Sequence, residues 1–133
     1  MGRLILDTGI LIALDRRKLT FADIVNHGDD VTVSTVAVAE FLAGAHLSST
    51  SEQRARHRAF ISRILGSVPV DDYTLAVAEK HAELMAHVRR IGYPRGALDL
   101  VIAATALTTN RTLVTTDAKA RFEELPGLSV RVV

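Results

Sequence analysis

The 133-residue chain contains no cysteine, so disulfide bonds, thiolate metal ligands and cysteine nucleophiles are all excluded. Any metal site must therefore be built from oxygen atoms or histidine nitrogens. Aromatic residues are scarce at 5%, and tryptophan is absent, which leaves too few rings for a platform on which bases could stack. The lack of cysteine suits a reducing compartment, and we expect a cytoplasmic protein.

A strong excess of either charge is also missing. Lys and Arg number 16 against 15 Asp and Glu, for a net charge of +1, so no global field favours a membrane surface or a polyanion. No apolar run has transmembrane length, and the apolar start is interrupted by Asp7 without a cleavage site after it, so we expect neither membrane association nor a signal peptide. Recognition of a partner must come from local clusters.

What the chain has is enough apolar material for one core. With 48% hydrophobic and 23% charged residues, its composition is that of a globular protein. The length fits one domain over residues 1–133 and is too short for two ordinary domains.

Short β-rich runs alternate with longer helical patterns along the chain. Strands separated by helices predict an α/β fold, a three-layer sandwich in which a five-stranded, mainly parallel sheet is flanked by helices. The candidate strands are Leu4–Leu6, Val31–Val33, Val68–Val70, Thr112–Thr115 and Ser129–Val133. The candidate helices are Thr8–Arg17, Thr20–His27, Thr35–Leu47, Ser51–Leu65, Thr74–Ile91, Ala97–Thr109 and Ala118–Leu125.

Two acidic residues directly follow candidate strands. Asp7 comes after Leu-Ile-Leu, and Asp117 comes after Thr-Leu-Val-Thr-Thr. In a parallel sheet, ligands bind beyond the carboxyl ends of the strands. Each residue taken alone has an ordinary alternative, because aspartate often caps the start of a helix.

Two further acids lie in apolar helical surroundings. The neighbours of Glu40 at three and four positions are Val, Ala, Ala and Gly, and no cation lies within helical reach. Asp99 precedes a run of apolar residues, with Arg95 four positions earlier. Ordinary alternatives are a partner across the fold for Glu40 and an interaction with Arg95 or the helix dipole for Asp99.

The four acids together are more informative than any one, because this topology can bring them into one pocket. Like charges about 4 Å apart cost about 4 kcal/mol at an effective dielectric near 20, so protons or a divalent cation must relieve the cluster. Oxygen ligands favour Mg²⁺ or Mn²⁺, whereas Zn²⁺ more often recruits histidine. The histidines show no metal-binding spacing, and the phosphate-binding glycine motifs are absent.

The same residues resemble the PIN domain family. The similarity rests on Leu-Ile-Leu-Asp-Thr, Val-Ala-Glu-Phe, Ala-Leu-Asp-Leu-Val-Ile-Ala-Ala-Thr-Ala and Leu-Val-Thr-Thr-Asp, which occur in the family's order across essentially the whole chain. The resemblance implies a quartet of Asp7, Glu40, Asp99 and Asp117, with Asp7 and Asp99 foremost as metal ligands. It implies that Thr115 orients the acids by hydrogen bonding.

The length favours the VapC toxin branch of this family. That branch implies a Mg²⁺- or Mn²⁺-dependent endoribonuclease, the toxin of a type II toxin–antitoxin pair, with RNA as substrate, a VapB-like antitoxin as partner and a homodimeric state. Two departures weaken a finer assignment: Thr116 stands where the family often has Asn or Arg, and the usual Pro before Asp99 is missing. The alternatives are a PIN nuclease that is not a toxin and a catalytically silent PIN-fold binding or scaffold module. A third alternative is an acidic phosphoacceptor domain that resembles a response-regulator receiver and has no nuclease activity.

Basic residues gather in two further segments. Arg54, Arg56, His57 and Arg58, with Arg63 a little further on, form one cluster, and Arg89, Arg90 and Arg95 form another. Both clusters could guide RNA phosphates, and Arg95 is the foremost candidate because it lies near Asp99. The ordinary alternative is a solvated helix face with the aliphatic stems lying on the surface.

Overall fold

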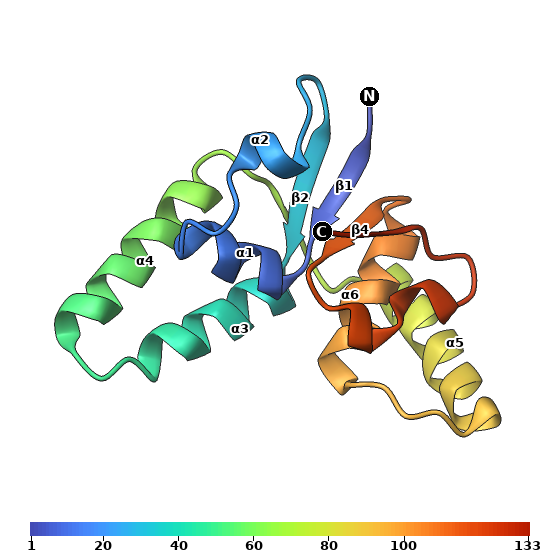
Figure 1. Ribbon diagram of the computed structural model, residues 1–133. Coiled ribbons are helices and arrows are strands. Elements are labelled where there is room, and N and C mark those ends of the chain that lie inside the picture. The colour runs from blue at the N-terminus through green and yellow to red at the C-terminus, as the bar shows by residue number, and fades with distance from the viewer.

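A five-stranded, entirely parallel sheet forms the centre of the molecule. The computed structural model describes all residues 1–133 (Figure 1). The sheet order is β3-β2-β1-β4-β5, and every neighbouring pair is parallel. The strands are β1 (Arg3–Leu6), β2 (Asp30–Ser34), β3 (Val70–Asp71), β4 (Thr112–Thr115) and β5 (Val130–Val132). The α/β prediction is confirmed, and the mainly parallel sheet is parallel throughout.

Helices cover both faces of this sheet. Figure 1 shows α1, α3 and α4 on one side and α5 and α6 on the other. The helices are α1 (Thr8–Asp15), α2 (Phe21–Ile24), α3 (Thr35–His46), α4 (Ser51–Leu65), α5 (Leu75–Ile91) and α6 (Ala97–Thr108), followed by the 3-10 turns η1 (Ala118–Ala120) and η2 (Phe122–Glu124). None of the helices has both the length and the apolar composition that crossing a bilayer requires.

Side chains along β1 point alternately to the two faces of the sheet, and the hydrophobic core accordingly consists of two clusters. Leu4 and Leu6 belong to a cluster with buried residues of α1, α3 and α4, whereas Ile5 belongs to a cluster with α5 and α6. Each of the three is at most 5% exposed. Because both faces of the strand are covered, it needs apolar residues at consecutive positions. Polar side chains of this strand are therefore expected only near its two ends.

Local hydrogen bonds set where the site-bearing helices begin. Ser34, the last residue of β2, accepts a 3.1 Å hydrogen bond from the backbone N–H of Ala37 and so starts α3. Gly92 adopts φ +68° after α5, a conformation that favours glycine, and ends that helix. The chain can then turn into α6. The cap at Ser34 therefore positions Glu40 on α3, and the turn after Gly92 leads to Asp99 on α6.

Some expected elements are shorter or of another type. The helix expected over Ala118–Leu125 is two 3-10 turns, because Arg121 between them has φ +51° and breaks the helical path. The helix expected over Thr20–His27 ends at Ile24, since Val25 is extended.

The third strand lies later than expected. Val68 is buried in the core, and Pro69 offers the sheet only its carbonyl, which accepts from the N–H of Val33 at 3.1 Å. Regular pairing therefore begins at Val70, opposite Val33.

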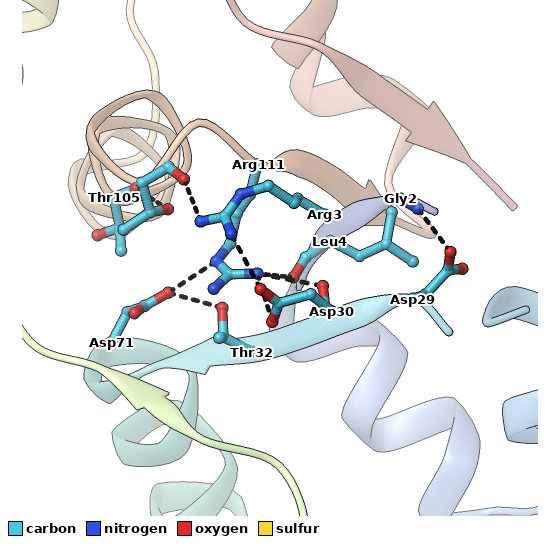
Figure 2. Close-up of polar contacts among 10 residues, drawn as sticks. Gly2, Arg3, Leu4, Asp29, Asp30, Thr32, Asp71, Thr105 and Arg111 are labelled. Carbon is cyan, nitrogen blue, oxygen red and sulfur yellow. Dashed lines mark hydrogen bonds and ion pairs between the residues drawn. The ribbon is translucent and has the colours of Figure 1, made fainter. Parts of the chain in front are cut away.

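A buried arginine links β1, β2 and β4 at the end of the sheet where these strands begin (Figure 2). Arg111, immediately before β4, has a side chain only 7% exposed. Its guanidinium contacts Asp30 at 3.1 Å and Asp71 at 3.3 Å, and it donates to the carbonyl of Leu4 at 3.4 Å. Thr32 donates to the same Asp71 carboxylate at 2.6 Å. The network joins β1, β2, β4 and the end of β3, and it does not involve the carboxyl ends of β1 and β4.

Candidate active site

Asp7 lies at the carboxyl end of β1 and is only 7% exposed. One carboxylate oxygen accepts from the N–H of Thr8 at 2.8 Å, so Asp7 does cap α1, and the other accepts from the Thr115 hydroxyl at 2.8 Å. Burial raises the pKa of Asp7, and the negative charges of Glu40 and Asp117 act in the same direction. The hydrogen bonds from Thr115 and Thr8 oppose that rise.

A threonine hydroxyl connects the first acid to the second. Thr8 donates to Oε1 of Glu40 at 2.7 Å, over a sequence separation of 32 residues. Thr8 opens α1 and Glu40 lies in the middle of α3, so this hydrogen bond ties the two helices together beside Asp7. Glu40 is partly buried. Its partner across the fold is therefore a hydroxyl group and not an arginine.

Asp117 follows β4 in the manner that Asp7 follows β1. Its backbone N–H donates to the Thr115 hydroxyl oxygen at 3.0 Å, and its Oδ1 accepts from the N–H groups of Lys119 and Ala120. The capping interpretation thus holds for Oδ1, which starts η1. Those two capping bonds use only Oδ1, and the exposed side chain leaves Oδ2 available to a ligand.

Asp99 has no hydrogen-bonding or ionic partner. It lies in the first turn of α6 and is half-buried. Burial, followed by the negative charges of Asp7, Glu40 and Asp117, raises its pKa to about 6. That mutual influence shows that the four acids, from β1, α3, α6 and the end of β4, share one electrostatic site.

The expected interaction of Arg95 with Asp99 is not found. The Arg95 guanidinium pairs with Glu124 at 3.7 Å, donates to the carbonyl of Ala120 at 3.3 Å and lies 4.5 Å from the centre of the Tyr93 ring. Its side chain is 5% exposed. Arg95 lines a cleft with Asp99, but its head group is already bound, so it is poorly placed to bind RNA phosphate.

The ligand atoms that these side chains offer determine which cation the site could bind. No three acidic or histidine side chains stand in a ready-made metal-binding group, so a cation would draw the carboxylates together or be completed by water. The site offers oxygen ligands only, and burial, followed by the uncompensated negative charges of the other three acids, raises the pKa of Asp99. The donor set and the missing charge both fit Mg²⁺ or Mn²⁺.

Sequence reasoning did not assign a role to Gly9 or find the contact of Thr8. A Cβ atom on Gly9 would lie 2.5 Å from the hydroxyl oxygen of Thr116, just after β4, so any larger residue at position 9 requires the Thr116 side chain to move. The Asp-Thr-Gly order at a strand end was the available clue. It places Thr8 and Gly9 where the two strand ends meet.

The chain belongs to the PIN domain family, whose match covers residues 4–128. Among its curated relatives are the ribonuclease VapC of Rickettsia bellii, 28% identical over 98% of this chain and 96% of the relative, and the tRNA(fMet)-specific endonuclease VapC of Shigella flexneri, 30% identical over 96% of each. The family prediction, including its VapC branch, is confirmed.

Solved structures agree on the fold. The chain matches VapBC2 from Rickettsia felis, bound to a promoter DNA fragment, with a TM-score of 0.87 at 22% identity over 98% of each chain. It matches the DNA-bound VapBC of Salmonella typhimurium with a TM-score of 0.86 at 24% identity over 99% of this chain and 98% of that one.

Proposed function

We propose that this chain is a VapC-type ribonuclease in which Asp7, Glu40, Asp99 and Asp117 hold Mg²⁺ or Mn²⁺ during cleavage of RNA phosphodiester bonds. The observation that carries the metal assignment is the carboxylate of Asp99, which is half-buried, has no partner and is subject to the negative charges of three other acids. A carboxylate in such surroundings is stabilised by a cation. The full-length relatives named as VapC ribonucleases support RNA cleavage as the reaction.

The acids and the threonines of the site have different proposed roles. Asp7 and Asp99 are the foremost ligands, and Glu40 and Asp117 complete the acidic pocket. Thr115 holds the Asp7 carboxylate through its hydroxyl, and Thr8 holds Glu40. Both threonines therefore fix the directions of the carboxylate oxygens before a ligand arrives. When bound, the cation supplies Lewis acidity that stabilises charge developing on the phosphodiester.

The partner of the proposed enzyme is an antitoxin of the VapB type. Support comes from the similar structures, which are VapBC complexes in Rickettsia felis and Salmonella typhimurium. A homodimer is proposed as well, because the monomer leaves large apolar side chains such as Leu75, Ile91 and Leu98 exposed. Light scattering from the purified chain tests the dimer directly.

Cleavage of an RNA mixture tests the proposed reaction. The purified wild type should cleave RNA with Mg²⁺ or Mn²⁺ and stop in excess EDTA. Asp7→Asn and Asp99→Asn should each lose at least about a hundredfold in rate while remaining folded, since each removes an anionic ligand. Asp72→Asn is the matched control, because Asp72 is exposed and lies outside the acidic pocket. Wild-type rates in the first two variants would contradict the metal site.

The toxin role is separable from the chemistry. Induction of the chain in cells should arrest growth, and co-expression with the neighbouring reading frame should restore it. Cleavage without growth arrest would indicate a nuclease of another cellular role. Absence of both would favour the silent binding or scaffold module.

A further inference from the structure

A cleft lined by four arginines opens beside the acidic pocket. We call it the arginine cleft: Arg16 and Arg17 follow α1, and Arg56 and Arg63 lie on α4. Its volume is about 400 Å³, within the range of clefts that hold a small ligand. The cleft is therefore large enough for a nucleotide-sized group.

The spacing along α4 explains how two of these arginines share one wall. Residues 56, 60 and 63 are four and three positions apart, which places them on one face of the helix. Phe60 between them is buried in the core and anchors this face. Arg56 and Arg63 flank it and remain exposed. The wall thus has an apolar base and a cationic rim.

All four arginines are free to bind a ligand. None of them forms an ion pair within the chain. The one acid in the lining, Asp15, is contacted at 2.5 Å by Nδ1 of His57 and is 10% exposed. An anion entering the cleft would therefore meet guanidinium groups in excess over available carboxylates.

The arginine cleft is continuous with the candidate active site. A smaller cleft of about 110 Å³ is lined by Glu40 and Phe41 on one side and by Asp15, Arg16 and His57 on the other. The last three residues also line the arginine cleft. A strand that places one phosphodiester at the acidic pocket can thus extend past Glu40 toward the arginines.

We propose that the arginine cleft binds the phosphate backbone of the RNA strand to one side of the cleaved bond. The inference rests on the proposed function, because the acidic pocket alone would repel a polyanion. Guanidinium groups match phosphate oxygens in geometry and charge. Four of them beside Glu40 would hold the flanking nucleotides while the acids act on the central phosphodiester.

Binding of a labelled single-stranded RNA 12-mer in EDTA tests this inference, with gels to verify that the RNA stays intact. No bound metal is needed, so a failure of the proposed metal-dependent cleavage would leave the measurement valid. On single strands each phosphate contact contributes about 0.7 to the slope of log K against log salt, and so about fivefold in affinity at about 0.1 M salt. The variant Arg56→Gln/Arg63→Gln should bind about 25-fold more weakly, with a slope shallower by about 1.4.

The matched control removes the same charge elsewhere. Arg89 and Arg90 lie in the last turn of α5, which Figure 1 places at the opposite end of the molecule from α4. Arg89→Gln/Arg90→Gln should keep its affinity within about twofold. Equal losses in both double variants would mean attraction by net charge alone and would overturn the cleft. No loss in either would overturn it as well.

A separate variant distinguishes binding from folding. Arg17 has φ +59°, a conformation that glycine adopts without strain. Arg17→Gly should unfold at the same or a higher temperature and yet bind the RNA about fivefold more weakly. Wild-type affinity in Arg17→Gly would contradict the phosphate contact.

An acidic peptide is the competing occupant, and polyglutamate of equal charge serves as its probe. If Arg56→Gln/Arg63→Gln bound the RNA normally but lost polyglutamate, the cleft would be a site for an acidic protein segment and the RNA proposal would be wrong.

Discussion

The hydroxyl group of Thr115 donates a 2.8 Å hydrogen bond to Oδ2 of Asp7 across 108 residues of chain. Both side chains are buried, and they lie at the ends of β4 and β1, which are adjacent parallel strands. The bond favours the ionised carboxylate and opposes the effect of burial on the pKa of Asp7. The same hydroxyl oxygen accepts from the N–H of Asp117, so one threonine organises two of the four acids.

Thr115→Val should therefore weaken the site while keeping the shape of the core. Without the hydroxyl, the pKa of Asp7 rises further, and the acid limb of the cleavage-rate profile should move to higher pH. A lost hydrogen bond to a charged group is worth about 1.5–3 kcal/mol, so we expect the cleavage rate on the acid limb of the profile to fall about tenfold or more. Thr115→Ser keeps the hydroxyl and should preserve the profile. An unshifted profile in Thr115→Val would contradict the positioning role.

Asp99→Asn should raise the free energy of unfolding of the metal-free protein at pH 7.5. The same substitution should abolish RNA cleavage at that pH. The folded-state pKa of about 6 lies above the ordinary 3.8, so the folded state retains a proton that the unfolded state has released. Stability is then full below about pH 4 and is lost as pH rises through about 6. After allowance for solvent screening of a half-buried group, the difference at pH 7.5 is about 1 kcal/mol, or about 3 °C in Tm.

Thermal unfolding in EDTA at two pH values checks this prediction. Asp99→Asn should unfold at a higher temperature than wild type at pH 7.5, and the difference should shrink at pH 4.5 and disappear only below about pH 4, where Asp99 is neutral in both the folded and the unfolded state. A variant less stable than wild type at pH 7.5 would show that Asp99 has a stabilising partner that the structure lacks.

The Arg111 network should matter for folding and not for chemistry. Arg111→Met leaves Asp71 and Asp30 without their buried cation, and we expect a loss of about 2–4 kcal/mol in the free energy of unfolding by denaturant. Arg3→Met is the matched control, because the Arg3–Asp30 pair is 49% exposed on both sides and should cost under about 1 kcal/mol. Similar losses in the two variants would argue against a special role for the buried guanidinium.

The order of elements could be predicted from the residues alone, and the four candidate acids could be selected in the same way. Asp7 and Asp117 can be recognised because each directly follows a candidate strand. Glu40 and Asp99 stand out because ionised groups are rarely found on apolar helix faces. Thr8 could not be assigned, since its partner Glu40 is 32 residues away and belongs to another helix. Long-range pairs of this kind depend on how α1 and α3 pack.

Arg111 shows the same limit at the other end of the sheet. In the local sequence Arg111 resembles a loop residue between a helix and a strand, and its partners Asp30 and Asp71, which stand beside other acids, resemble ordinary loop acids. Only the parallel order of β3, β2, β1 and β4 brings them together. The helix expected over Ala118–Leu125 failed for a local reason, because the left-handed backbone of Arg121 is not encoded by any glycine or proline.

Direct binding of Mn²⁺, followed by loss of the free-ion signal in electron paramagnetic resonance, tests the central claim without any dependence on substrate. The wild type should bind Mn²⁺ at pH 7.5, and its affinity should fall as pH drops below about 6, where protons compete with the cation for the Asp99 carboxylate. Asp99→Asn and Asp7→Asn should bind at least about tenfold more weakly, and Asp72→Asn should match the wild type. Equal Mn²⁺ affinity in Asp99→Asn and wild type would contradict the four-acid metal site.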